Sequence, residues 1–113
     1  MVKESAPANP LGSFEELVML AVLRTRDEAY GMNVRREIER VTERDVAIGA
    51  VYATLDRLEA KGLVTSGRTR TAGASRRMFE VTRAGARALA ETRAVRERLW
   101  AGVDLRRLVA LAG

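Results

Sequence analysis

The apolar residues of this chain change their spacing at Gly62, and that change limits the folds open to it. Before Gly62 they recur every three or four residues, which is the spacing of an amphipathic helix with one buried face. This stripe is Val51, Leu55 and Leu58. After Gly62 come two segments rich in β-forming residues, LVTSG at 63–67 and RRMFEVT at 76–82. A glycine after the last apolar position often ends a helix, so we expect a helix over 48–62 that leads into a β-hairpin.

Two more helices are predicted before this one. Ser13 and Glu16 form an S-x-x-E capping box, which predicts a helix that begins there and ends at the polar stretch 25–28. A second helix is expected from Tyr30 or Gly31 to Thr42, with one apolar stripe facing inward. The members of that stripe are Val34, Ile38 and Val41.

The chain is predicted to end in a long helix. Thr82 can cap a helix that runs from Arg83 to about Ala101. Gly102 and Asp104 then indicate a break before the short apolar tail LRRLVALA. Thr92 is the one polar residue within the apolar stripe of the long helix.

Composition excludes several classes of protein. A chain of 113 residues is expected to form one domain, and it contains neither cysteine nor histidine. Disulfides, thiolate or histidine metal sites and Ser-His or Cys-His catalysis are therefore excluded, and we expect neither an enzyme nor a cofactor. We find no apolar run long enough to cross a membrane and no signal-peptide core, so we expect a cytoplasmic protein.

The positive charge is concentrated between the two β-like segments. The formal net charge is +5, and residues 66–77 hold Arg68, Arg70, Arg76 and Arg77 without any acid. A basic loop punctuated by glycine and serine is typical of a phosphate-binding element. The alternative is a loop whose charges only keep the protein soluble.

The order of the elements, three helices and then a hairpin, predicts a winged helix-turn-helix with an appended helix. The fold class is mainly α with a two-stranded β-wing. We expect a flexible arm over 1–12, a DNA-binding domain over 13–82, and a dimerisation helix with its tail over 83–113. One alternative is a winged-helix module that binds protein instead of DNA, for which a neutral or acidic wing is expected. Another is an enzyme that uses only carboxylates or Lys61, which the missing histidine and cysteine disfavour.

The third helix carries small side chains on the face opposite its buried stripe. At 3.6 residues per turn this face consists of Gly49, Ala50, Ala53, Arg57 and Ala60. Short side chains let the start of the helix approach a phosphate or the floor of the DNA groove, and alanine can contact a thymine methyl. Tyr52 lies beside this face and is either a phosphate contact or a structural residue. The alanines are also explained by helix propensity alone.

These motifs together resemble the PadR-like transcriptional regulators over residues 14–100. The resemblance rests on the segments YGMNVRREIE, IGAVYATLDRLEAKGLV and GASRRMFEVTRAGARAL. The family features fall on Gly31, on Gly49, Tyr52, Leu55, Arg57, Leu58, Glu59, Gly62 and Leu63, and on Arg76, Arg77, Phe79, Thr82 and Gly85. The chain departs from the pattern at Ala50 and Ala53, where the family often has Thr and Pro, and at Ala74–Ser75 in the wing tip.

The resemblance implies a dimeric regulator, usually a repressor of its own or a neighbouring operon, which binds double-stranded DNA. The last helix would pair with the first helices of a second copy, and its own apolar stripe agrees with this. The expected interface residues are Phe14, Leu17, Ala88, Val95, Leu99 and Val103. A single helix after the wing would place the chain among the short members of the family. In those members the interface can bind flat hydrophobic compounds, so Trp100 is either an effector contact or a packing residue.

Overall fold

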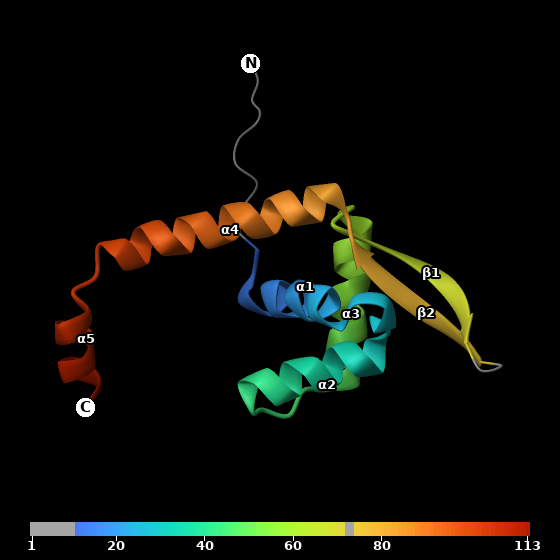
Figure 1. Cartoon of the computed structure of the whole chain (residues 1–113), viewed down its shortest axis with the longest axis horizontal. Helices are drawn as coiled ribbons and strands as arrows, with labels where there is room; N and C mark the ends of the chain where they lie inside the picture. The colour runs from blue at the N-terminus through green and yellow to red at the C-terminus, as the bar shows by residue number, and fades with distance from the viewer. Residues whose placement is uncertain (1–10, 72–73) are drawn as a thin grey trace, which may run out of the picture.

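The computed structural model describes residues 11–71 and 74–113, which form helices followed by a hairpin and two more helices (Figure 1). The elements in chain order are α1 (Ser13–Thr25), the short 3-10 turn η1 (Arg26–Glu28), α2 (Gly31–Thr42), α3 (Ile48–Ala60), β1 (Val64–Thr71), β2 (Ala74–Val81), α4 (Arg83–Ala101) and α5 (Leu105–Ala112). The first three helices pack together, and the hairpin projects from one side of them. This is the winged helix-turn-helix predicted from the sequence.

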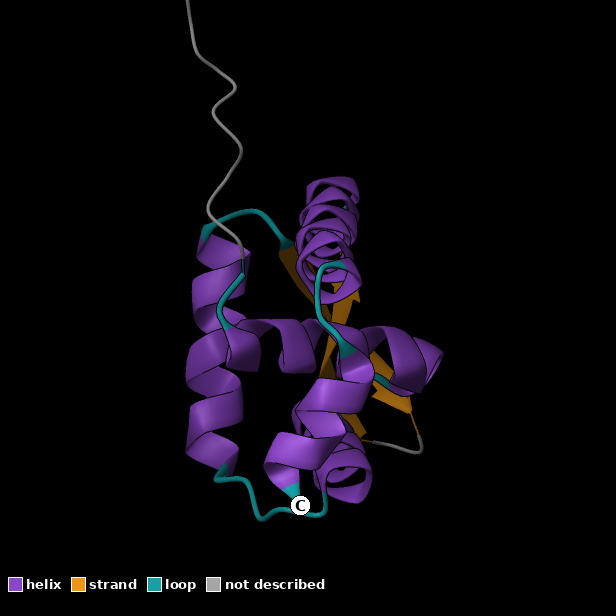
Figure 2. Cartoon of the chain, turned by 90° about the vertical axis from the view of Figure 1, so that its left-hand side faces the viewer, coloured by secondary structure: helices purple, strands orange, loops and turns teal. Residues whose placement is uncertain are grey.

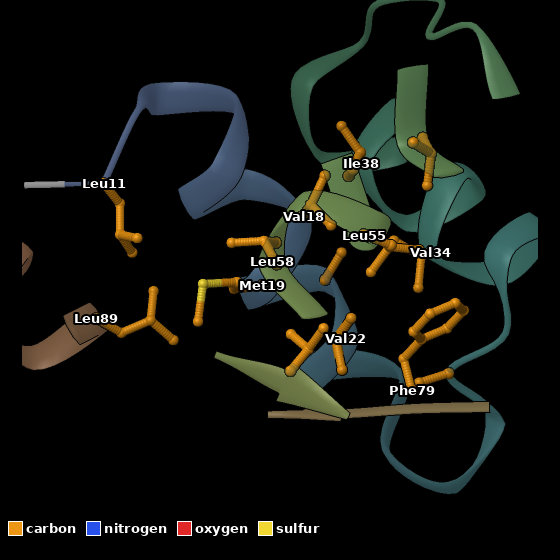
Figure 3. Close-up of a cluster of buried hydrophobic side chains, with 14 residues drawn as sticks. Leu11, Val18, Met19, Val22, Val34, Ile38, Leu55, Leu58, Phe79 and Leu89 are labelled. Carbon is orange, nitrogen blue, oxygen red and sulfur yellow. The ribbon is translucent and has the colours of Figure 1, made fainter. Parts of the chain in front are cut away.

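The core lies where α1, α2, α3, the base of the hairpin and the first half of α4 meet (Figure 3). Its fully buried side chains include Phe79, Met19, Leu55, Leu58, Val18, Val34 and Val51. Burial of such apolar side chains is the main favourable term in folding this domain. Val41, predicted in the stripe of α2, is instead 54% exposed, because it lies in the last turn of α2 at the edge of the core.

The cap at the start of α1 lies one residue before the predicted capping box, and only the bond from the N3 glutamate is present. Gly12 occupies the cap position, and its backbone N–H donates to Glu15 Oε1 at 3.1 Å. The Glu15 Oε2 accepts from Lys61 Nζ at 2.8 Å, and this bond lowers the pKa of the Glu15 carboxyl. Ser13 and Glu16 therefore do not form the predicted box, and Glu16 pairs with Arg96 at 2.8 Å.

The connection between α2 and α3 is held by two side chains of α2. Arg35 Nε donates to the carbonyl oxygen of Val46 at 2.7 Å, and the Val46 N–H donates to Glu39 Oε2 at 2.8 Å. Both backbone groups of Val46 are satisfied in this way, which fixes the residue just before α3 begins. The direction of α3 is thereby set by α2.

The end of α3 matches the glycine prediction. Gly62 has a φ of +77°, which glycine adopts without steric penalty. The Leu63 N–H donates to the Leu58 carbonyl at 2.9 Å and the Gly62 N–H to the Glu59 carbonyl at 2.9 Å. This pair of bonds is a Schellman motif, and it turns the chain directly into β1.

The hairpin, called the wing below, is longer than predicted. The antiparallel strands pair from Val64↔Val81 out to Thr71↔Ala74, so most of the predicted basic loop 66–77 is strand. The wing is fixed at its base, where the Phe79 N–H donates to the Ala29 carbonyl at 2.9 Å. The extra length consists of residues 68–71 and 74–75, which pair across the hairpin although their own strand propensity is weak.

The helix α4 begins as predicted, because Thr82 Oγ1 accepts from the Gly85 N–H at 3.0 Å. Its first half packs on the domain: Leu89 and Thr92 are buried. The Leu11 N–H donates to Thr92 Oγ1 at 3.2 Å, and Leu11 is itself buried. The predicted flexible arm 1–12 therefore extends too far at its end, while residues 1–10 lie outside the described part of the chain.

The predicted tail forms a second helix, α5, after the wing. Asp104 Oδ1 accepts from the Arg106 and Arg107 N–H groups at 3.1 and 3.2 Å, which is an ordinary N-cap. Figure 2 looks along α4, with α5 in front and the strands at the far end of the molecule. The expectation of a single C-terminal helix is therefore wrong. None of the described helices is long and apolar enough to cross a membrane.

Candidate nucleic-acid interface

The helix α3 separates its side chains as predicted. Val51, Leu55 and Leu58 are buried, while the opposite face is open to solvent. The exposed residues of that face are Gly49, Ala50, Ala53, Arg57 and Ala60. Arg57 Nη2 donates to Thr54 Oγ1 at 3.1 Å, so the one long side chain on this face lies back along its own helix. The first two turns consequently present almost bare backbone.

The N-terminus of α3 is also open. Ala47 occupies the cap position, and no side chain of the described residues caps this end. A Cβ at Gly49 would meet nothing within 4 Å. Helix N-termini carry partial positive charge and free N–H groups, so this end favours a negatively charged group such as a phosphate.

Tyr52 lies across the start of α2. Its ring and hydroxyl occupy the place where a Cβ of Gly31 would stand. The side chain is 36% exposed, so it is held by α2 and still reaches solvent beside the bare face. The packing of Tyr52 explains the glycine that opens α2, and its contact with a phosphate stays a prediction.

A hollow of about 540 Å³ separates α2 and α3 from the wing. It is lined by Tyr30, Met32, Arg36, Tyr52, Arg68, Ser75, Arg76 and Arg77. Four of these residues are arginines, so the hollow attracts anions. Arg36 has no distinguishing signal in the sequence, because it is one of several arginines in a helix whose charges alternate in sign. Only the fold brings it to the wing.

The arginines of the wing have different surroundings. Arg68 and Arg76 are exposed, and the Arg76 guanidinium lies 4.2 Å from the centre of the Tyr30 ring. Arg70 lies on β1 opposite Ser75, and its side chain is outside the described part. The exposed guanidinium groups have the charge and the fork of donors that bind phosphate oxygens.

Arg77 differs from its neighbours, because it forms ion pairs with α3. Its Nη2 lies 2.7 Å from Glu59 Oε1 and 3.1 Å from Asp56 Oδ1, and its Nε donates to Ser66 Oγ at 3.2 Å. Hydrogen bonds from Ser66 and Arg77 lower the pKa of the Glu59 carboxyl. That Arg77 binds phosphate together with its neighbours stays a prediction, and in the structure its charge is paired with Glu59 and Asp56 of the same chain.

Comparison with known proteins agrees with this geometry. The sequence profile of the Transcriptional regulator PadR-like family matches residues 19–91. The chain belongs to the PadR-like family. The chain is 40% identical to the transcriptional regulator Rv3488 of Mycobacterium tuberculosis over 73 residues. The aligned region covers 65% of this chain and 67% of that protein. This PadR-like protein is thus a DNA-binding transcriptional regulator and not an enzyme.

Solved structures show the same fold. A PadR-like transcriptional regulator from Bacillus cereus superposes with a TM-score of 0.71 at 16% identity, over 85% of this chain and 90% of that one. A PadR family regulator from Eggerthella lenta has a TM-score of 0.64 at 27% identity, over 82% and 80% of the two chains. The winged helix-turn-helix of this PadR-like regulator is therefore kept at low sequence identity.

The residues predicted for a dimer interface fall into two groups in this PadR-like regulator. Phe14 and Ala88 are partly buried and pack against the domain's own core. Leu17, Val95, Leu99 and Val103 are exposed, with Leu99 at 70%. The second group lies on α1, on the outer half of α4 and in the turn that follows it. The exposed apolar side chains of α5 come directly after this group in the chain, and they are Leu105, Leu108, Val109 and Leu111.

Trp100 lies at the outer end of α4 and is 56% exposed. With Leu99, Val103 and Leu108 it lines a small apolar hollow of about 180 Å³ at the corner between α4 and α5. Its ring is therefore not a core residue of its own domain. It is available to a second copy or to an apolar ligand.

Proposed function

We propose that this PadR-like regulator binds its operator through the bare face of α3 and the exposed arginines of the wing. The observation that carries the proposal is the pairing of an uncapped, side-chain-poor helix start with an arginine-lined hollow beside it. The α3 face then lies in the major groove, and the wing lies on the adjacent backbone.

The contacts divide by chemistry. Gly49, Ala50 and Ala53 let α3 approach the base edges, where the alanine methyl groups meet thymine methyls. Tyr52 and Arg57 contact phosphates on either side of the groove, and Arg36 adds charge from α2. Of the wing arginines, Arg68, Arg70 and Arg76 bind the backbone.

We further propose that two copies act together as a repressor. A homodimer joined through the outer half of α4 presents two α3 helices to half-sites about one turn of B-DNA apart, ~34–36 Å. Such a dimer on a two-fold site within its own or a neighbouring promoter blocks access to that DNA. A reporter gene behind the chain's own upstream DNA should fall in expression when the regulator is supplied, and a rise would show activation instead.

The bare face is tested by adding bulk to it. Ala53→Leu should keep the fold, because Ala53 is exposed, but should prevent close approach to DNA and weaken operator binding by at least tenfold. Ala60→Leu, two turns further along the same exposed face, is the matched control and should bind almost normally. Binding is measured by fluorescence anisotropy on a duplex enriched from a random library by the full-length chain.

Tight binding by a folded Ala53→Leu protein would show that this face does not meet DNA. Failure of the wild-type chain to prefer any enriched duplex would instead favour the protein-binding module.

A small hydrophobic effector is the remaining part of the proposal. The apolar hollow beside Trp100 would take the flat part of such a compound, and binding there would change the position of α5 relative to α4. Because the chain has a single tryptophan, its fluorescence reports this site directly. Titration with a planar aromatic dye should quench that emission, and unchanged emission at saturating dye would remove Trp100 from the site.

A further inference from the structure

The ion pair between Arg77 and Glu59 lies at the point where the wing leaves the core. At the base, Val64 and Phe79 are buried side chains of the two strands. Two residues further out along each strand, Ser66 of β1 and Arg77 of β2 both reach Glu59 on α3. These side chains face α3 because alternate residues of a strand point to the same side. Arg68, which lies opposite Arg77 in the strand register, is exposed.

The cluster joins three elements through short contacts. Ser66 Oγ lies 3.0 and 2.8 Å from the two carboxylate oxygens of Glu59, and Arg77 Nη2 lies 2.7 Å from one of them. The Arg77 guanidinium also stacks 4.7 Å from the centre of the Phe79 ring. About a third of each ionic side chain is exposed, 32% for Arg77 and 34% for Glu59. A partly buried network of this kind holds its members in one arrangement better than an isolated surface pair.

A two-stranded ribbon needs such a brace. Isolated hairpins are only marginally stable, and strands of this length extend ~20 Å from their base. A rotation of ~10° at the base moves a side chain at that distance by ~3 Å, which is a whole hydrogen-bond length. The wing arginines can therefore meet a phosphate only if the angle between the wing and α3 is fixed.

We propose that Arg77 is a positioning residue, which with Glu59 sets the angle of the wing to α3 and does not itself bind DNA. This inference rests on the proposed function, because it presumes that the wing meets the DNA backbone. The pairing also explains why α3, which approaches phosphates in the proposed complex, carries the acidic residues Glu59 and Asp56. Paired with Arg77, Glu59 and Asp56 lose much of their repulsion toward DNA.

The first test uses the full chain without DNA. Glu59→Gln and Arg77→Gln should each raise amide hydrogen exchange about tenfold in the outer wing, residues 66–69 and 75–77, with the Phe79 amide at the base unchanged. Arg68→Gln is the matched control and should leave exchange at wild-type rates. Unchanged amide exchange in both Glu59→Gln and Arg77→Gln would overturn the proposal, whether or not the protein binds DNA.

The second test measures DNA affinity and its log–log dependence on salt concentration. It uses the enriched duplex and a mixed-sequence duplex of equal length. Glu59→Gln and Arg77→Gln should each weaken binding to the enriched duplex about fivefold while leaving the log–log salt slope unchanged. The double variant should bind no worse than Arg77→Gln alone, because that substitution already removes the pairing with Glu59. Arg68→Gln should instead lower the slope by ~1.

A direct phosphate contact by Arg77 predicts the opposite pattern. Loss of the Glu59 carboxylate would then free Arg77 and tighten binding, and Arg77→Gln would lower the salt slope by ~1. Either result overturns the positioning role. If the wild-type chain prefers neither duplex, the proposed DNA contact fails, and the exchange experiment still decides whether the wing is braced.

Discussion

The two halves of α4 carry the same apolar repeat and have different surroundings. In the first half, Leu89 and Thr92 are buried against the domain. In the second half, Val95 and Leu99 continue the spacing and are exposed, as are Val103 in the turn after α4 and the apolar face of α5. The family match ends at residue 91, close to this change. An apolar stripe that outruns its own domain indicates that a second surface covers it, and our proposal assigns that surface to another copy.

Removal of the outer half of α4 should have the largest effect on dimerisation and operator binding. A chain ending at Ala94 keeps the buried half of α4 and should fold as a monomer. Its operator affinity should fall by at least ~100-fold, toward non-specific binding, because only one half-site is then held. A chain ending at Thr82 also loses Leu89 and the bond from Leu11 to Thr92, so the domain itself should be destabilised.

Sedimentation and circular dichroism separate these outcomes. At micromolar concentration the full chain should sediment as a dimer and the chain ending at Ala94 as a folded monomer. A full-length monomer with specific operator binding would exclude the dimer mechanism.

Two matched substitutions distinguish the buried half of α4 from the exposed half. Leu89→Ala removes a buried side chain and should lower the free energy of unfolding by ~2–4 kcal/mol. Leu99→Ala removes an exposed one and should change the stability of the monomer by less than ~0.5 kcal/mol. It should nevertheless weaken dimerisation.

Thermal melts at several protein concentrations measure both effects. For the wild type, the melting temperature should rise with concentration, because association stabilises the folded state. That dependence should diminish in Leu99→Ala and persist in Leu89→Ala. Equal loss of stability in both variants, at every concentration, would mean that both halves of α4 pack within one chain.

A fall in pH should have the smallest effect. It should lower the free energy of unfolding of the winged domain through Glu37 on α2. Hydrogen bonds from Arg40 and Arg24 lower the pKa of Glu37 from 4.5 to about 2. Because the folded-state pKa is depressed, this pairing contributes stability above about pH 4.5, which is lost as the pH falls toward about 2. Glu37→Gln should therefore flatten the fall in unfolding free energy over that window, as measured by urea melts. An identical pH profile would show that the pairing does not stabilise the fold.

Much of the fold follows from local signals in the sequence. The spacing of Val51, Leu55 and Leu58, together with Gly62, determines α3 and its end, and Thr82 determines the start of α4. These features act within one or two turns of helix, so a sequence pattern contains them. The cap of α5 at Asp104 is equally local. The sequence pattern nevertheless predicts an apolar tail there and not a helix.

The remaining errors concern contacts between distant residues. Arg77 resembles Arg68 and Arg76 in sequence, and only the fold brings Glu59 within 2.7 Å of it. The wing extends past its predicted strands because residues 68–71 and 74–75 also pair across the hairpin. Arg36 reaches the hollow because the fold places α2 beside the wing. Charge and periodicity do not specify such partners, so the sequence predicts a basic wing but not which of its arginines pairs within the chain.

The bare face of α3 has a consequence for how regulators of this kind diverge. The side chains of Ala50 and Ala53 are exposed, and a Cβ at Gly49 would meet nothing within 4 Å. Substitution there is free of packing constraints, whereas the neighbouring core residues Val51 and Leu55 cannot change without loss of the core. The proposed readout surface and the buried stripe are thus interleaved along one helix, and one can change without the other. A new operator preference can arise by a few point substitutions in a domain whose stability stays the same.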